Sequence, residues 1–242
     1  MIYRGMKAAD VRKELKSMAD PGKAAILQRF FKTGPSQYGE GDIFIGVMVP
    51  QSRLVAKKFN QLPLGEVRTL LYSRVHEERL VALLILVWRY SSASSSREKE
   101  EIVKFYIDHI KQVNNWDLVD LSATNILGAH LVDRDNRRRL LYRLAGSENV
   151  WERRIAIVAT HYFIRNGDFS DTLKIAEMLL QDRHDLIHKA VGWMLREVSK
   201  RDAAAEEEFL EKHCSVMPRT MLRYAIERLS KRRRRRYMIS YR

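Results

Sequence analysis

The chain is poor in three residue types that would point to particular classes of protein. Cys214 is the only cysteine among 242 residues, which excludes an intramolecular disulfide and any metal or iron–sulfur site built from cysteines. With eleven glycines and five prolines, long stretches run without a helix-breaking residue. No strand–glycine-loop–helix unit occurs, which argues against a Rossmann or P-loop nucleotide site. We expect neither a metal ion nor a cofactor.

Long apolar runs are also lacking. The longest, residues 80–88, is far shorter than the roughly 20 residues that cross a bilayer. The N-terminal segment is charged from its fourth residue and has no apolar run of the kind found in signal peptides. We therefore expect a cytoplasmic protein, nucleoid-associated if bacterial, with no membrane partner.

Negative charge is scarce relative to positive charge. Lys and Arg total 44 against 30 Asp and Glu, a formal net charge of +14. Seven of these cations and no acid lie in the last twelve residues, so removing this tail would halve the net charge and leave a basic body. A basic body favours polyanionic partners, with nucleic acid first and an anionic membrane second, and charge alone does not choose between them.

Helical periodicity extends over nearly the whole sequence. Asp20-Pro21 has the N-cap and the first-turn proline of a helix start, residues 35–42 form the clearest loop, and Val49-Pro50 restarts a helix. After a short turn at residues 91–96, the sequence is typical of paired helices joined by short polar turns. We predict these helices near 97–113, 116–131, 135–145, 149–165, 170–181, 185–199, 202–213 and 218–231.

The helices opening at residues 116, 151 and 187 recur about every 35 to 40 residues, a period typical of HEAT-like helical pairs. The predicted fold is therefore an all-α, HEAT-like helical-repeat solenoid with a basic concave groove. We expect a single domain over residues 1–230, followed by an Arg-rich C-terminal tail at 231–242.

A curved solenoid offers a groove in which cations can bind the phosphates of a duplex without reading its bases. Any one pair of cations at helical spacing also fits an ordinary solvated helix face, but the excess over several helices favours nucleic acid. The candidate pairs are Arg53 with Lys57, Lys189 with Arg196, and Arg219 with Arg223.

Asp120 is the first residue whose position suggests chemistry. Asn115 is a plausible N-cap, and Asp117 falls in the first helical turn, where the helix dipole favours an anion. Asp120 instead lies one turn after Trp116, on the margin of the apolar stripe. A carboxylate there is costly unless it is paired or faces a cleft, so a structural ion pair and a functional role both fit.

Arg154 lies three residues after Trp151, at the edge of the apolar stripe of its own helix. Its guanidinium suits an ion pair with Asp120 or a bidentate grip on a phosphate, and a purely structural buried pair is the competing interpretation. The neighbouring Arg153 is expected to point into solvent.

Trp193 does not belong to the apolar stripe of its helix. It shares a face with Lys189 and Arg196, at spacings of four and three residues. A tryptophan between cations is a poor core residue and a good surface for a sugar, a base or a cation. Packing beneath a neighbouring helical pair is the alternative.

Two histidines four residues apart, His184 and His188, have the spacing of zinc ligands. The usual Glu after the first His and a third ligand are missing, so we set a metal site aside. No Gly-x-Ser-x-Gly elbow or Cys/His nucleophile pattern is present either.

In three blocks the chain resembles the AlkD-type DNA alkylation-repair glycosylases, an all-α family of HEAT-like repeats. The resemblance runs from about residue 23 to residue 228 and leaves out the Arg-rich tail. It assigns the active-site roles of the family to Trp116, Asp120, Arg154 and Trp193, and it places Phe30 at an aromatic position that approaches DNA in some members. The three blocks are Trp116-Asp-Leu-Val-Asp120, Trp151-Glu-Arg-Arg154 and residues 189–197.

The resemblance implies hydrolysis of the N-glycosidic bond of cationic N3- or N7-alkylated purines in duplex DNA, without a cofactor. A solenoid that encircles a duplex works as a monomer, which is the state we expect, although the sequence leaves the oligomeric state open. Asp120 would stabilise the positive charge on the sugar and orient the attacking water, while Trp116 and Trp193 would face that charge. Arg154 would hold the adjacent phosphate. No helix-hairpin-helix signature and no lysine placed as a Schiff-base nucleophile are evident, so we expect a monofunctional enzyme that leaves an abasic site.

Two other functions compete with this one. The first is a non-catalytic HEAT-like scaffold that binds nucleic acid or protein, although such a scaffold needs neither Trp193 on a cationic face nor Asp120 beside Trp116. The second is an RNA-binding helical repeat, which the absence of base-reading side chains at fixed positions weakens.

Overall fold

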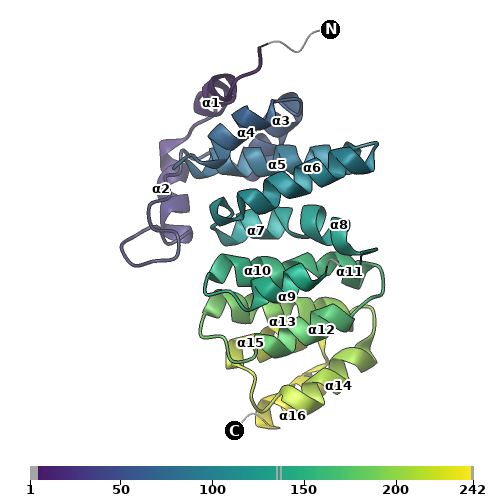
Figure 1. The fold of residues 1–242 in the computed structure, drawn as a ribbon. Coiled ribbons are helices and arrows are strands. Elements are labelled where there is room, and N and C mark those ends of the chain that lie inside the picture. Colours follow the sequence, from purple (N-terminus) through teal and green to yellow (C-terminus); the bar gives the residue numbers. More distant parts are fainter. Residues whose placement is uncertain (1–4, 135, 137, 241–242) are drawn as a thin grey trace. The chain divides into compact units, whose positions relative to one another are not determined.

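The computed structural model describes residues 5–134, 136 and 138–240 (Figure 1). Within these ranges the regular structure is helical, and the nearest approach to a strand is an isolated bridge between Ile43 and Val75. The prediction of an all-α chain of successive helices is confirmed. By its internal contacts the chain divides into two compact units, Met1–Ser122 and Ala123–Arg242. The single domain over 1–230 and the basic groove stay predictions.

The first unit is built around one buried helix, α5 (His76–Ser92). Residues 80–86 of α5 are all buried, because a helix that is apolar on every side must be covered on every side. The apolar run that is too short for a bilayer is thus the core of this unit. The helices packed on α5 are α1 (Ala8–Ser17), α3 (Val49–Lys58), α4 (Leu64–Leu71), α6 (Ser96–Asp108) and α7 (Trp116–Ser122).

Besides a short 3₁₀ helix, η1 (Ile110–Gln112), this unit contains α2 (Pro21–Phe30), which starts as predicted. Asp20 is its N-cap, accepting a hydrogen bond from the backbone N–H of Lys23 at 3.0 Å, and Pro21 occupies the first helical position. The loop that follows α2 passes very close to this cap. A Cβ on Gly46, whose φ is +84°, would lie 2.1 Å from the carbonyl oxygen of Asp20, so only glycine fits there.

A buried carboxylate holds the same loop to α5. Glu77, in the first turn of α5, accepts hydrogen bonds from the backbone N–H groups of Ile45, Gly46 and Val47 at 3.0, 2.9 and 3.3 Å. Backbone donors satisfy the charge of a group that is only 1 % exposed. The loop, and with it the N-terminal start of α2, where the Asp20 N–H donates to the carbonyl oxygen of Ile45 at 2.9 Å, is therefore fixed to the central helix.

The second unit has α13 (Asp185–Ser199) at its centre, packed against α10, α11, α12, α14 and α15. The bounds of α13 agree with the predicted helix at 185–199. The predicted helix at 149–165 divides at Thr160, and the one at 218–231 ends before α16 begins. Residues 135 and 137, in the predicted helix at 135–145, lie outside the described residues. The other elements are η2, a π-helical turn (Thr124–Gly128), α8 (Ala129–Leu131), α9 (Arg139–Ala145), α10 (Val150–Ala159), α11 (His161–Arg165), α12 (Ser170–Met178), α14 (Ala203–His213), α15 (Arg219–Ala225), the 3₁₀ turn η4 (Ile226–Arg228) and α16 (Lys231–Ser240).

Helix α13 buries its apolar stripe completely and approaches α15 closely. A Cβ on Gly192 would lie 2.4 Å from the carbonyl oxygen of Met221, so the two backbones are nearly in contact. Because Gly192 lets the two helices come so close, the polar side chains of α13 lie near those of α15. The stripe consists, as predicted, of Ile187, Ala190, Val191, Met194 and Val198.

Among the described residues, no helix combines the length and the apolar character needed to cross a membrane.

Candidate functional site

In the first unit, Trp116 lies within a cluster of aromatic rings. Phe31 stacks on it with ring centroids 5.1 Å apart and planes 10° apart, and Phe30 meets it edge-on at 5.9 Å. Phe31 in turn stacks on Phe44 at 4.8 Å. Trp116 is half-buried, whereas Phe30 is 61 % exposed. The structure thus brings together Trp116 and Phe30, the two aromatic site residues predicted in this unit, at its surface.

The N-terminus of α7 is fixed by a buried asparagine. The Asn115 side-chain oxygen accepts a hydrogen bond from the N–H of Trp116 at 2.8 Å, in keeping with its predicted capping role. Its amide nitrogen donates to Asp42 at 3.0 Å. Because Asn115 is fully buried, these bonds are shielded from water and hold the first turn of α7 in place.

His76 joins this cap to the central helix. Its Nδ1 lies 3.0 Å from Asp42 and its Nε2 lies 2.8 Å from Asp117, the residue after Trp116. Arg79 donates to the other oxygen of Asp42 at 2.6 Å. His76 also stacks on Phe44, at 4.4 Å between ring centroids. The sequence did not identify this group, which we call the His76 cluster: Asp42, His76, Arg79, Asn115 and Asp117.

Charge compensation shifts the pKa values inside the His76 cluster. Burial alone would lower the pKa of His76, but the carboxylates of Asp117 and Asp42 outweigh burial and raise it above its ordinary value. Burial would likewise raise the pKa of Asp42, but hydrogen bonds from His76 and the charge of Arg79 lower it. The cluster therefore holds ionised groups against one another beneath the start of α7.

Asp120 lies one turn beyond Trp116 on α7 and is half-buried. It shares this helix with Asp117, whose side chain points into the His76 cluster. Trp116 and Asp120 belong to the first unit, whereas Arg154 and Trp193 belong to the second.

In the second unit, Arg154 is buried on α10, with 5 % of its surface exposed. Its Nη1 donates to the carbonyl oxygen of Leu186, in the first turn of α13, at 2.5 Å. The prediction that its neighbour Arg153 is solvated is wrong. Arg153 pairs with Asp182 at 2.6 Å and donates to two backbone carbonyl groups, because the loop before α13 carries a buried carboxylate to it.

Trp193 is half-buried on α13. Its indole N–H donates to Glu197 at 3.2 Å, and its ring centroid lies 5.6 Å from that of His161. Burial would raise the pKa of Glu197, but Lys200, His161 and the indole N–H lower it, so the carboxylate stays ionised. The structure therefore fixes the edge of Trp193 through a charged hydrogen-bond acceptor.

Three of the four cations predicted to bind phosphate on α13 and α15 line one cavity of about 750 Å³ in the second unit. Lys189 pairs with Asp185 at 2.7 Å, and Arg196 pairs with Glu227. The cavity is lined by Asp185, Lys189, Arg196, Thr220, Arg223, Tyr224 and Glu227, a set that leaves out Arg219. In the first unit, Arg53 and Lys57 are exposed one turn apart on α3.

The two histidines with zinc-ligand spacing make separate contacts. His184 Nδ1 accepts a hydrogen bond from the N–H of Leu186 at 3.2 Å, and His188 Nε2 contacts the carbonyl oxygen of Asp182 at 2.5 Å. Over the ranges that the structure describes, no three His, Cys, Asp or Glu side chains gather in a way that could hold a metal ion.

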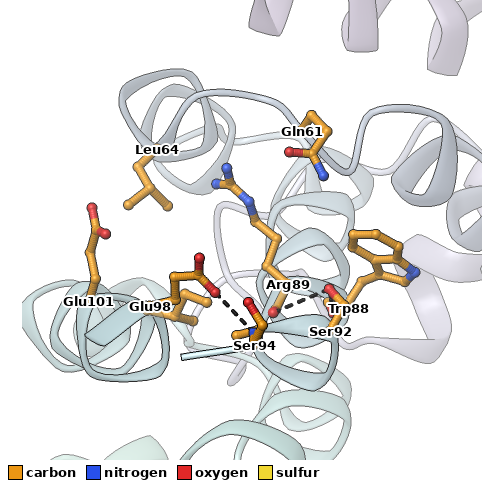
Figure 2. Close-up of a pocket in the computed structure, with 10 residues that line it drawn as sticks. Gln61, Leu64, Trp88, Arg89, Ser92, Ser94, Glu98 and Glu101 are labelled. Atoms are coloured by element: carbon orange, nitrogen blue, oxygen red, sulfur yellow. Dashed lines mark hydrogen bonds between the residues drawn. The ribbon is translucent and has the colours of Figure 1, made fainter. Parts of the chain in front are cut away.

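Figure 2 shows a further cavity of about 510 Å³, in the first unit, which none of the predicted site residues lines. Trp88 stands on one side, Arg89 reaches between Leu64 and Gln61, and two acids of α6 stand opposite (Figure 2). Arg89 donates to the carbonyl oxygen of Leu62 at 3.2 Å. The cavity mixes both signs of charge and favours no class of ligand.

A model of the family described as "DNA alkylation repair enzyme" matches residues 11–229. The chain belongs to this DNA alkylation repair family. Family membership gives it a role in the repair of alkylated DNA, with DNA as its substrate. The match ends before α16, so the Arg-rich C-terminal helix lies outside the family region.

Two solved structures share the fold. A protein from Enterococcus faecalis, described as a predicted DNA alkylation repair enzyme, is 20 % identical with a TM-score of 0.70, over 88 % of this chain and 98 % of that one. The smu.31 protein from Streptococcus mutans UA159 is 17 % identical with a TM-score of 0.50, over 84 % of this chain and 94 % of that one. The comparison with curated proteins gave no match.

Proposed function

We propose that this member of the repair family is a monofunctional DNA glycosylase that hydrolyses the N-glycosidic bond of N3- or N7-alkylated purines in duplex DNA. The observation that carries the proposal is the arrangement on α7, where Asp120 lies one turn beyond Trp116 and Trp116 is stacked and capped in place. Family membership supplies the class of substrate.

The chemistry suits these side chains. An alkylated purine already carries a positive charge, so it leaves with the bonding electrons as a neutral base and needs no general acid. The positive charge then develops on the deoxyribose, where a carboxylate stabilises it. Asp120 accepts a proton from the attacking water while the hydroxyl adds to the sugar carbon that the base leaves.

The two tryptophans add cation–π stabilisation to the same charge. Each contributes about 1–2 kcal/mol when the ring face is shielded from water. The contacts of the two rings support this role: Phe31 stacks on Trp116, and Glu197 holds the indole N–H of Trp193. Arg154 binds the phosphate beside the reacting sugar.

The surface cations and one exposed ring bind the rest of the duplex. Cations at helical spacing contact phosphates without reading sequence, and an exposed aromatic ring next to Trp116 packs against the nucleotides that flank the lesion. We assign these roles to Phe30, Arg53, Lys57, Lys189, Arg196, Arg219 and Arg223.

Incubation with a duplex that carries N7-methylguanine tests the proposal. We expect release of free N7-methylguanine from the wild-type protein, a strand that stays intact until heated with base, and no release from undamaged DNA. The strand stays intact because a monofunctional glycosylase forms no Schiff base with the sugar.

Two outcomes contradict the proposal. A folded protein that binds the duplex without releasing base is the non-catalytic scaffold. Strand cleavage that accompanies base release and is trapped by borohydride reveals an amine nucleophile and excludes the water mechanism.

A further inference from the structure

The Arg-rich C-terminal segment, which lies outside the family match, forms a helix docked on the second unit. Helix α16 begins with six consecutive cations, Lys231 and Arg232 to Arg236, and contains no acid. Figure 1 shows α16 beside α14. Arg233 pairs with Glu207 of α14, and Tyr237, which is 3 % exposed, donates to the same carboxylate. One face of α16 is therefore committed to α14.

The opposite face of α16 is exposed and cationic. At 100° per residue, Lys231, Arg232 and Arg235 fall within about 100° of arc, on the side away from Arg233 and Tyr237. All three are exposed, and none has an ion-pair partner among the described residues. Lys231 and Arg235 also stand one turn apart, so they form a short row along the helix axis.

This arrangement opposes the stability of the helix. Like charges three and four residues apart on a helix repel one another, and no acid within α16 offsets that repulsion. The acids of α14 neutralise the docked face only. A polyanion laid along the exposed face would remove the repulsion, and a DNA duplex carries one negative charge per roughly 1.7 Å of its axis.

We propose that the exposed face of α16 is a second phosphate-binding surface, one that holds the duplex backbone outside the family region. The choice of partner rests on the proposed function, since family membership brings the protein to DNA. A membrane fits less well, because an interfacial helix needs an apolar face that is free to insert: Tyr237 is buried against α14, and Ile239, which is exposed, is a single side chain rather than a face.

Neutralising the exposed face tests the proposal. The triple variant Lys231→Gln, Arg232→Gln, Arg235→Gln keeps Arg233 and Tyr237, and glutamine is a good helix former, so α16 stays docked. With undamaged duplex DNA, we expect the slope of log K against log salt concentration to become less steep by roughly 2 to 3. Affinity near 0.15 M salt should weaken on the order of 10- to 100-fold.

The matched control removes three exposed cations from the first unit: Lys13→Gln, Lys16→Gln, Arg68→Gln. Its change in net charge is identical, and we expect a change in slope below about 1. An unchanged slope in the α16 variant overturns the proposal. An equal loss in the control overturns it too, because net charge alone would then account for the effect.

Two further measurements separate this proposal from its alternatives. If wild type binds phosphatidylserine vesicles more tightly than duplex DNA and the α16 variant loses that binding, a membrane is the partner and the proposal fails. Base release is measured separately under single-turnover conditions at saturating duplex, where the α16 variant should match wild type. A wild type that releases no base, combined with the expected loss of slope, contradicts the glycosylase function and leaves the α16 surface standing.

Discussion

At the scale of single residues, Trp116 and Asp120 depend on neighbours that take no part in the proposed chemistry. Phe31 covers one face of the indole, and Asn115 fixes the backbone of the same residue. Asp120 follows one turn later on the helix that these contacts anchor. Preorganisation of this kind lets a carboxylate act on a developing charge without paying for reorientation during the reaction.

Asp120→Asn replaces the carboxylate with an amide of nearly the same shape, so it tests the role of the negative charge alone. We expect base release from N7-methylguanine duplex to slow by ~10²–10⁴-fold under single-turnover conditions, because the amide neither stabilises a sugar cation nor accepts a proton from water. Affinity for the damaged duplex should change little, since phosphate contacts dominate binding.

Asp108→Asn is the matched control for this variant. Asp108 is an exposed carboxylate on α6 whose ion pair with Lys104 is of the weak surface kind. We expect its rate and affinity to equal those of wild type. If Asp120→Asn keeps wild-type activity, the assigned mechanism is wrong even though the family is right.

At the scale of elements, the His76 cluster ties the start of α7 to α5 and to the loop around Asp42. The pKa of His76 is raised, so the stability it contributes is fully present below its ordinary pKa of 6.5 and is lost as pH rises through the raised value. The pKa of Asp42 is lowered, so its contribution is present above 3.8 and is lost as pH falls through the lowered value.

The cluster should therefore stabilise the fold most between about pH 4 and pH 6.5. We expect His76→Gln to lower the free energy of unfolding by about 3–5 kcal/mol at pH 6, because Asp117 loses its ion-pair partner and Asp42 keeps only Arg79 and Asn115. Urea unfolding measured from pH 5 to pH 9 should show the difference in free energy of unfolding between wild type and His76→Gln shrinking as pH rises above 6.5.

Other histidines change the stability with the opposite sign, so the difference between wild type and variant is the quantity to follow. Burial lowers the pKa values of His161 and His184, whose contributions are lost as pH falls. The contributions of His161 and His184 are the same in wild type and in His76→Gln, so they cancel when one free energy of unfolding is subtracted from the other. A difference that is flat from pH 5 to pH 9 would show that folding leaves the pKa of His76 unchanged, and a difference that diminishes as pH falls below 6.5 would show that His76 is neutral in the folded protein.

The sequence predicts helix α13 closely and misses the His76 cluster, for physical reasons. The apolar stripe of α13 repeats at helical spacing, so local periodicity alone sets its bounds. The His76 cluster joins residues more than 30 positions apart, and the run from His76 to Arg79 resembles a solvated helix start. The four polar side chains of this run, from His76 to Arg79, are instead all buried, and only the tertiary contacts reveal that burial.

The candidate site residues also separate into features that spacing along a helix predicts and features that depend on tertiary packing. The pattern of Trp116 and Asp120 on one helix face is readable from spacing, as is the exclusion of Trp193 from the apolar stripe. The partners that hold these rings, Phe31 and Glu197, depend on packing and on rotamers. A buried acid–histidine pair that links a loop to a helix start leaves no periodic signal in sequence.

At the scale of the whole molecule, the proposed chemistry needs both units. Trp116 and Asp120 belong to the first, and Arg154 and Trp193 belong to the second. Cations predicted to bind phosphate occur in both units, and α16 adds more at the C-terminal end. In the proposed mechanism, Asp120 and Trp193 act on the same nucleotide in the same step, so their contributions to the rate must be coupled.

A double-mutant cycle with Asp120→Asn and Trp193→Ala measures this coupling in single-turnover base release from N7-methylguanine duplex. Trp193→Ala alone should slow release by about 5- to 30-fold, as expected for a lost cation–π contact. Trp88→Ala, which removes a tryptophan that is 37 % exposed in the cavity of Figure 2, should leave the rate unchanged.

The double variant should be far less impaired than the product of the two single losses, because both side chains stabilise one developing charge. Losses that multiply, or a Trp193→Ala rate equal to that of Trp88→Ala, would contradict a shared site for the sugar cation.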